Sequence, residues 1–468
     1  MQEEHKKKNQ KELIIKFEAS LKESPNLYFD EEAYLDIIAY YQDHGKLKMA
    51  RKAADLALIS HPYSTDIVTE KAEVLTQLNM KDQALKLLET ALTLHPNDPD
   101  LLIQMGSLYA RRTEYKKAID SFKMSLMRAE NKDEVLYNIG LSYQGMQKYN
   151  HAVKYYKEAI SINITNERVL YELAFCLDLL GKLESSIDYY QQFIEKDPYS
   201  EIAWYNLGIV YNKLGYFDKA IDAYEYAIAI DDSFSSAFFN LGNVYMNKNR
   251  YDKALASYND SLTLEGPSAE IYCHIGACHE KLTELDKAIK YYQKALKLDQ
   301  FYHEAYFGLG VSLTLREKYH EATHFLKKAI KLCPTNGLYW KTLGEAESEV
   351  GNIVSALEAF KSAASLIPSD EGIWLDWSLV LYDQGNYQEA IEILEQGLEE
   401  YADSVDIHYR IVVYLMSMGH YKEAFNKLEI ALILDFDKHV QLFEFFKNPQ
   451  TQSALFKIIE QYRKKDNK

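Results

Sequence analysis

Apolar residues recur at intervals of three and four along nearly the whole chain, in short segments separated by turn residues. Residues 201–234 show the pattern most clearly, with one apolar stripe before Gly215 and a second stripe after it. Because this spacing puts side chains on one face of an α-helix, we predict two short amphipathic helices joined by a tight turn at Gly215. The small residues Gly208, Ala220 and Ala227 are expected where the two helices cross most closely.

The same pattern returns every 34 residues from Glu31 onward, without an insertion. The repeats are predicted to begin at Glu31, Thr65, Pro99, Asp133, Glu167, Glu201, Ser235, Ala269, His303, Gly337, Glu371 and Val405. Position 20 of these units is alanine in eleven of the twelve, and position 8 is glycine in seven. Proline recurs at position 32, just past the second helix, where a residue that cannot continue a helix is favoured. The sequence therefore predicts twelve copies of one helical hairpin.

These positions taken together resemble the tetratricopeptide repeat (TPR), in which each unit is a helix-turn-helix hairpin. The resemblance covers residues 31–438 and implies an all-α fold, an α-solenoid in which stacked hairpins form a right-handed superhelix. It also implies that the first helix of each unit lines the inner surface and that the second helix lies outside. Stacking is required on physical grounds as well, because one hairpin cannot bury both of its apolar stripes alone.

Both ends of the chain are expected to cover the open faces of the stack. Residues 1–30 predict a basic tip and a capping helix, whose apolar face carries Leu13, Ile14, Phe17 and Leu21. Residues 439–468 predict C-terminal capping helices. In this segment the repeat pattern continues through Leu442, Phe445 and Phe446 until Pro449, and a last helix is expected over residues 452–463.

Two units depart from the pattern in ways that have structural consequences. Position 11 is usually a large apolar residue, but it is His279 in the eighth unit and Glu347 in the tenth. A buried carboxylate is costly, so we expect a rotated helix or loose packing at Glu347 and a possible bend there. In the fifth unit Ser186 and Phe193 replace alanines at close helix contacts, which predicts a wider spacing of its two helices.

Charge and composition exclude several classes of function. The net charge of −17 argues against nucleic-acid binding, because neutralising phosphates requires concentrated Lys and Arg. No apolar run approaches the roughly 18 residues that a spanning helix needs, and the first residues lack the apolar region of a secretory signal, so no direct membrane insertion is expected. The four cysteines are too unevenly spaced for a disulfide framework. We expect a cytoplasmic protein, whose oligomeric state the sequence does not determine.

The repeats and caps leave no segment for a catalytic domain, and neither a phosphate-binding loop nor an HExxH motif occurs. We therefore expect no enzyme activity and no cofactor. The best metal-like cluster is Cys273, His274, Cys278 and His279. His274 and Cys278 lie one helical turn apart and could share a metal ion, but Cys273 points to another face. Packing is the favoured interpretation of this cluster, and no metal site is predicted.

Partner binding is the favoured function, as a scaffold or adaptor that holds a protein segment along the concave face of units four to nine. In arrays that this chain resembles, positions 2, 5, 9, 12 and 13 of the first helices line the inner groove. The predicted partner-binding residues, at positions 5 and 9, are Tyr137, Leu141, Tyr171, Phe175, Tyr205, Ile209, Phe239, Asn243, Phe307 and Val311. They predict an apolar track for a peptide segment or an amphipathic helix. An equally open interpretation is that the position-5 aromatics pack only against their neighbours.

Position 2 is acidic in seven units, so we expect a partner with apolar anchors flanked by Lys or Arg. Chaperone-binding members of the family hold a C-terminal carboxylate with cations at position 5 and asparagines at position 9. Here Lys341 and Asn243 each stand alone at those positions, which argues against that ligand. A second possible function is a regulatory or sensor array that changes curvature when a peptide or partner binds.

Overall fold

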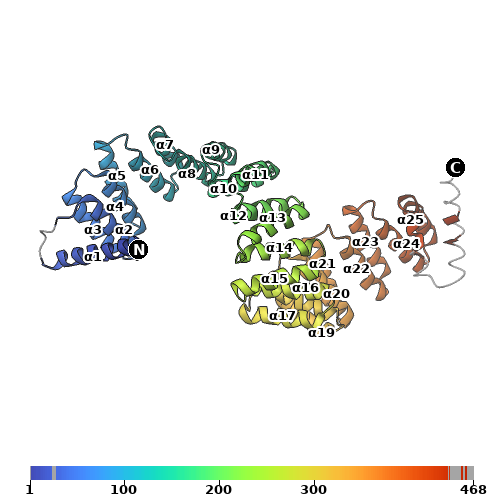
Figure 1. The fold of residues 1–468 in the computed structure, drawn as a ribbon. Helices are drawn as coiled ribbons and strands as arrows, with labels where there is room; N and C mark the ends of the chain where they lie inside the picture. The colour runs from blue at the N-terminus through green and yellow to red at the C-terminus, as the bar shows by residue number, and fades with distance from the viewer. Residues whose placement is uncertain (1, 24–27, 441, 443–454, 457–458, 461–468) are drawn as a thin grey trace. The chain divides into compact units, whose positions relative to one another are not determined.

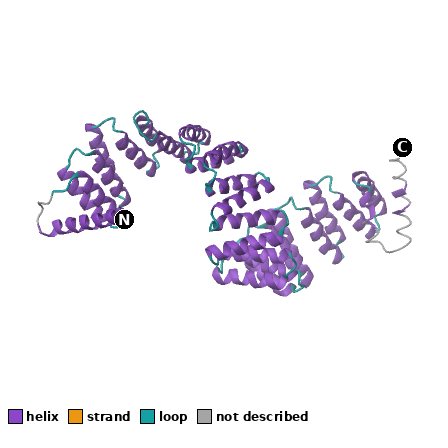
Figure 2. Cartoon of the chain, viewed as in Figure 1, coloured by secondary structure: helices purple, strands orange, loops and turns teal. Residues whose placement is uncertain are grey.

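The computed structural model describes residues 2–23, 28–440, 442, 455–456 and 459–460 (Figure 1). The chain divides into two compact units, Met1–Asp232 and Ser233–Lys468, each of which is described by itself. Throughout the described residues the regular structure is helical, without a strand (Figure 2). The prediction of an all-α stack of helical hairpins is confirmed.

In the first unit, helix α1 (Gln2–Glu23) precedes six hairpins. Their first helices are α2 (Glu31–Asp43), α4 (Thr65–Gln77), α6 (Pro99–Arg111), α8 (Lys132–Gly145), α10 (Glu167–Leu179) and α12 (Glu201–Lys213). Their second helices are α3 (Leu47–Ser60), α5 (Lys81–Leu94), α7 (Tyr115–Ser125), α9 (Tyr149–Ile162), α11 (Ile187–Lys196) and α13 (Phe217–Ile230), with the 3₁₀ turn η1 (Leu183–Ser186) before α11.

The second unit continues with six more hairpins. Their first helices are α14 (Ser235–Asn247), α16 (Ala269–Lys281), α18 (His303–Thr314), α20 (Gly337–Val350), α22 (Glu371–Asp383) and α24 (Val405–Ser417). Their second helices are α15 (Tyr251–Glu265), α17 (Leu285–Leu298), α19 (Tyr319–Leu332), α21 (Ile353–Leu366), α23 (Tyr387–Glu400) and α25 (Tyr421–Leu434), followed by the 3₁₀ turn η2 (Asp437–His439). Each proline at position 32 follows the end of a second helix, as predicted.

Every hairpin turns through one residue in the left-handed region of backbone conformation. This residue recurs at position 15, with φ between 56° and 87°, in all twelve units. Six of these residues are glycines, which adopt positive φ without a steric penalty. The predicted tight turn at Gly215, where φ is +77°, is therefore a feature of the whole array.

The glycine at position 8 has a packing reason. A Cβ atom added to Gly208 would lie 2.7 Å from the Tyr224 ring, and one added to Gly140 would lie 2.3 Å from the Tyr156 ring. These rings belong to position 24 of the second helix, and both are almost fully buried. The position-20 side chains are also buried in all twelve units, so the small residues lie at the close crossing, as predicted.

Serine caps connect neighbouring hairpins in three places. The Ser200 hydroxyl accepts a hydrogen bond from the backbone N–H of Ala203, which caps α12, and donates one to Glu167 at the start of α10. Ser64 makes the same pair of bonds with Ile67 and Glu31, and Ser404 makes it with Ile407 and Glu371. A cap that satisfies an exposed helix N-terminus thus also fixes the spacing between successive units.

The fifth hairpin differs from the others. Its second helix begins with η1, where the Ser186 hydroxyl donates a hydrogen bond to the carbonyl of Leu183, and α10 packs on η1 rather than along α11. Phe193 is buried, at 1% exposure. A cavity of about 410 Å³ lies beside α11, against Trp204 and Tyr226 of the next hairpin. These observations agree with the predicted wider spacing.

Glu347 resolves its packing conflict by pairing. The side chain is fully buried, its Oε1 lies 2.6 Å from Lys327 Nζ, and its Oε2 accepts a hydrogen bond from Asn352. Helix α20 continues through this position, and Oε1 has this ion pair but no hydrogen bond of good geometry. The rotated helix or loose packing expected here stays a prediction, and so does the bend expected at this junction.

The ends join the adjacent cores. Ile14 and Phe17 of α1 are buried with residues of α2 and α3, while Leu442, Leu455 and Ile459 are buried with residues of α21 to α25. Phe445, Phe446, Pro449 and most of the helix predicted over residues 452–463 lie outside the described residues. Among the described helices, none combines the length and apolar character required for a membrane span.

Candidate functional site

Helix α10 carries an exposed apolar stripe, which we define as Tyr171, Phe175 and Leu179. Their side chains are 52%, 42% and 50% exposed, and the spacing of four residues puts them on one side of the helix. Large apolar side chains clustered on a surface mark interaction sites more often than single ones do. Two of the three were predicted from sequence. Leu179 was missed because only positions 5 and 9 were considered, although the family resemblance also implies position 13 for the inner surface.

The neighbouring helix α12 extends this surface. Tyr205 and Ile209 are half-buried, and Ile202, at position 2 of the same helix, is 38% exposed. Helices α10 and α12 contact each other directly. The extension by Ile202 was also missed, since position 2 was considered for its acidic residues alone.

Helix α8 offers less accessible surface than predicted. Tyr137 is buried, and its ring centroid lies 6.0 Å from that of Tyr156. The Arg168 guanidinium lies over the Tyr137 ring. Leu141 is half-buried. Burial and these contacts favour the packing interpretation at Tyr137.

The partner-binding residues predicted in the second compact unit, Ser233–Lys468, are all half-buried. On α14, Phe239 packs against the rings of Tyr258 and His274, and Asn243 accepts a hydrogen bond of 2.7 Å from the Tyr258 hydroxyl. On α18, Phe307 stacks on Tyr339 with ring centroids 4.5 Å apart, and Val311 lies one turn further along. Phe239 and Asn243 thus contact Tyr258 of their own hairpin, whereas His274 and Tyr339 belong to the hairpin that follows.

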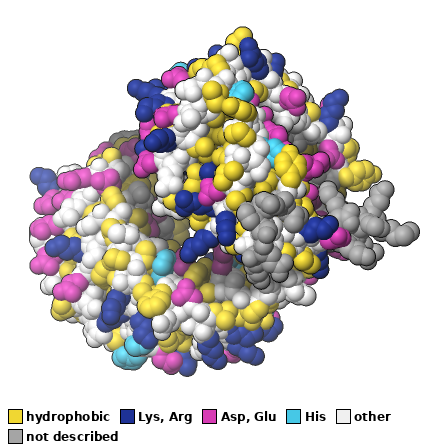
Figure 3. Space-filling model, turned by 90° about the vertical axis from the view of Figure 1, so that its left-hand side faces the viewer, with side chains coloured by type: hydrophobic (Ala, Val, Ile, Leu, Met, Phe, Trp, Pro, Cys, Tyr) yellow, Lys and Arg dark blue, Asp and Glu magenta, His cyan; other side chains and the backbone are white. Residues whose placement is uncertain are grey.

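Charges near the α10 stripe are mostly paired. Arg168 forms an ion pair of 2.7 Å with Glu134, and Lys213 pairs with Asp178. Further toward the N-terminus, carboxylates influence one another. Burial and the neighbouring carboxylates of Asp98, Asp66 and Glu130 raise the pKa of Asp100. Figure 3 shows that charged side chains of both signs are mixed with apolar ones over the face in view.

The Cys273–His279 cluster is divided among separate environments. Cys278 is buried with its Sγ 3.3 Å from Met246 Sδ, and His274 lies against the Phe239 and Tyr258 rings. His279 Nδ1 lies 2.6 Å from Glu284. Burial raises the pKa values of Cys273 and Cys278 to about 12, which disfavours the thiolate that metals bind. In the described part of the chain, no three His, Cys, Asp or Glu side chains are grouped to hold a metal ion.

Family models described as tetratricopeptide repeat match seven segments of the chain. The matched residues are 134–166, 168–200, 202–234, 235–266, 269–302, 303–336 and 381–432. Together these segments make up more than half of the sequence. A search of curated proteins found no match.

Three of the solved structures that resemble the chain are MamA, YrrB and the Cut9–Hcn1 complex. MamA is 26% identical over 36% of this chain and 92% of its own, with a TM-score of 0.33. YrrB, described as a TPR protein with an unusual peptide-binding site, is 22% identical over 42% of this chain and 97% of its own, with a TM-score of 0.34. The APC/C hetero-tetramer Cut9–Hcn1 contains a chain that is 15% identical, over 85% of this chain and 96% of its own, with a TM-score of 0.40.

Proposed function

Because the chain belongs to the tetratricopeptide repeat family, whose repeats mediate protein–protein interactions, we propose that it is a scaffold or adaptor that holds a segment of a partner protein against its first helices. The observation that carries the proposal is the exposed α10 stripe. Three large apolar side chains on one helix face are costly to leave in water, and covering them favours association.

The partner segment presents apolar side chains to the stripe. Residues four apart on a helix are separated by about 6 Å along its axis, so the stripe offers contacts over about 12 Å. Fully burying one large apolar side chain contributes about 1.5–3 kcal/mol, and a few such anchors dominate most interfaces. Ile202, Tyr205 and Ile209 of α12 extend the contact in the first unit.

The remaining predicted residues form the outer part of the proposal. Leu141 adds to the surface of the first unit, and Phe239, Asn243, Phe307 and Val311 offer a further contact surface in the second. The net charge of −17 and the acidic position-2 residues favour partner segments with Lys or Arg beside the apolar anchors. Four free cysteines favour a reducing compartment such as the cytoplasm.

The test is a double substitution, Tyr171→Ser with Phe175→Ser. Because both side chains are exposed, the fold is expected to survive, as circular dichroism and thermal unfolding would check. Partners are captured on the wild-type protein and identified by mass spectrometry, and their affinity for the variant is then measured. We expect binding to weaken by about 30-fold or more, as for the loss of two interface anchors.

Tyr199→Ser with Phe301→Ser is the matched control. The control removes the same two residue types, a tyrosine and a phenylalanine. Their side chains are 80% and 66% exposed, and both residues lie outside the first helices. The control variant is expected to bind like the wild type. Equal affinity of all three proteins for every captured partner would place the binding surface elsewhere and overturn the proposal.

A further inference from the structure

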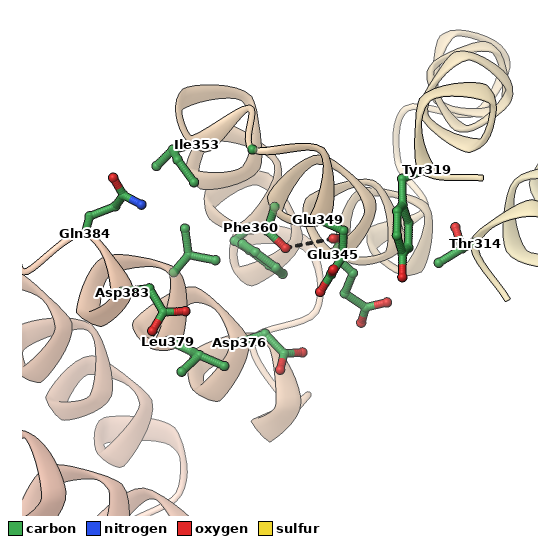
Figure 4. A pocket seen from close by; sticks show the side chains of 13 residues that line it. Thr314, Tyr319, Glu345, Glu349, Ile353, Phe360, Asp376, Leu379, Asp383 and Gln384 are labelled. Atoms are coloured by element: carbon green, nitrogen blue, oxygen red, sulfur yellow. Dashed lines mark hydrogen bonds between the residues drawn. The ribbon is translucent and has the colours of Figure 1, made fainter. Parts of the chain in front are cut away.

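The second unit contains a cavity of about 560 Å³ beside α20, α21 and α22 (Figure 4). Its charged lining consists of four carboxylates, Glu345 and Glu349 from α20 and Asp376 and Asp383 from α22. Figure 4 shows the side chains of Glu345, Glu349 and Asp376 around the same space between the two helices. Lysine and arginine are absent from the cavity lining.

The cationic side chain closest in sequence to these carboxylates is directed elsewhere. Lys341, one turn before Glu345 on α20, donates hydrogen bonds of 3.0 and 3.1 Å to the carboxylate of Asp370. Burial raises the pKa of Glu345, and the Asp376 carboxylate raises it further. Burial also raises the pKa of Asp376, although Lys341 and Arg410 oppose that shift. Lys341 also opposes the shift at Glu345. A further cation in the cavity would stabilise the charged form of both acids.

The rest of the lining suits a long side chain with a charged end. Leu379 provides apolar surface, Phe360 lies behind the lining at 1% exposure, and the Tyr319 ring lies on another side of the cavity. Lysine and arginine have aliphatic stems that pack on apolar surface while the charged group stays with polar partners. An aromatic ring attracts such a cation as well. A metal ion would gain nothing from the apolar and aromatic walls.

We propose that this cavity binds a lysine or arginine side chain of a partner protein segment. Such a side chain brings a cation to the four carboxylates and places its stem on Leu379. The inference rests on the proposed function in one respect only, namely that the ligand is part of a protein. It gives the acidic character of the array a defined recognition site, separate from the α10 stripe.

The experiment uses the full chain and small probes, so that no natural partner is required. Binding of Nα-acetyl-arginine amide is titrated by saturation-transfer difference NMR and compared with Nα-acetyl-citrulline amide, its neutral isostere. We expect arginine to bind and citrulline to bind about tenfold more weakly, because charge-assisted hydrogen bonds are lost. In the variant Glu345→Gln with Asp376→Asn, arginine is expected to bind about tenfold more weakly than in the wild type.

Glu358→Gln with Glu389→Gln is the matched control, because both residues are exposed and lie on second helices outside the cavity. This variant removes the same net charge and is expected to bind arginine like the wild type. Circular dichroism and thermal unfolding check that each variant is folded. An equal loss of binding in both variants would indicate a general charge effect and overturn the proposal.

Other outcomes also overturn it. Arginine binding that is unchanged in the cavity variant, or equal to citrulline binding, excludes a cation site at this cavity. Tighter binding of spermidine than of arginine amide, lost in the cavity variant, assigns the cavity to a free polyamine. Because the Tyr171→Ser, Phe175→Ser variant keeps the cavity intact, it is expected to bind the arginine probe normally. The proposal for the cavity and the proposal for the α10 stripe can therefore be refuted independently.

Discussion

At the scale of single residues, the recurring glycine at position 8 is a packing requirement. The rings at position 24 lie where a Cβ would be, at contact distances below 3.0 Å for Gly106, Gly140 and Gly208. The second hairpin of the array has a different pair at this contact. Its position 8 is Ala72 and its position 24 is the smaller Leu88, and both residues are buried. In the hairpins of Gly106, Gly140 and Gly208 the ring at position 24 therefore leaves no room for a side chain at position 8.

We expect Gly208→Ala to destabilise the protein by about 1–3 kcal/mol, the usual cost of overpacking a core. Thermal and urea unfolding measure the change. The rescue variant Gly208→Ala with Tyr224→Leu reproduces the Ala72–Leu88 pair and is expected to lose less stability than the two single changes added together. If Gly208→Ala is as stable as the wild type, the tight contact with Tyr224 is not what requires glycine.

At the scale of one element, the fifth hairpin shows that a departure from the repeat pattern can be built into the packing. Ser186 replaces alanine at position 20 and holds η1 through its hydrogen bond to Leu183. Phe193 replaces a small residue at position 27 and is buried, as is Tyr190 one turn earlier. The α10 stripe belongs to this same hairpin.

Restoring the small residue in this hairpin is expected to be harmful. Phe193→Ala matches most other units but removes a buried ring, so we predict a loss of about 3–5 kcal/mol. Unfolding experiments on the variant measure this loss, and Ile162→Ala, at a side chain that is 55% exposed, is the control. A variant that is as stable as the wild type would mean that α11 can close onto α10 and recover the usual spacing.

At the scale of the whole molecule, the array depends on contacts between neighbours. Each hairpin packs on the next within its unit, and the buried residues form a series of local clusters along the chain. In such arrays stability is approximately a sum of unit and interface contributions. Separate hairpins can therefore carry separate binding surfaces, as we propose for the α10 stripe and the acidic cavity.

The scaffold proposal predicts that ligand binding leaves the array unchanged. Small-angle scattering of the full chain, with and without a captured partner peptide, is expected to give the same radius of gyration for the protein once the mass of the peptide is taken into account. The alternative sensor function requires the curvature to change, because a sensor must convert binding into a different conformation. A clear change on binding would favour the sensor, with the junction at Glu347 as the first place to examine.

The sequence was sufficient for the helices, their order, the turn positions and the small residues at the crossings. Each of these depends on interactions within one hairpin or with the next, which recur at a fixed distance along the chain. Accessibility was harder to predict. Tyr137 and Tyr171 occupy the same position of successive units, yet one is buried and the other is 52% exposed. Their difference depends on which neighbouring side chains reach them.

The repeat pattern by itself determined that this chain folds as stacked helical hairpins, because every hairpin has an apolar face that only its neighbours can cover. Tertiary structure decided how Glu347 is neutralised, which apolar side chains reach the surface, and where four carboxylates line one cavity. These features arise between residues of different helices, at distances and angles that vary from one hairpin to the next. A periodic sequence specifies the geometry that all hairpins share, whereas individual side chains determine where one hairpin departs from it.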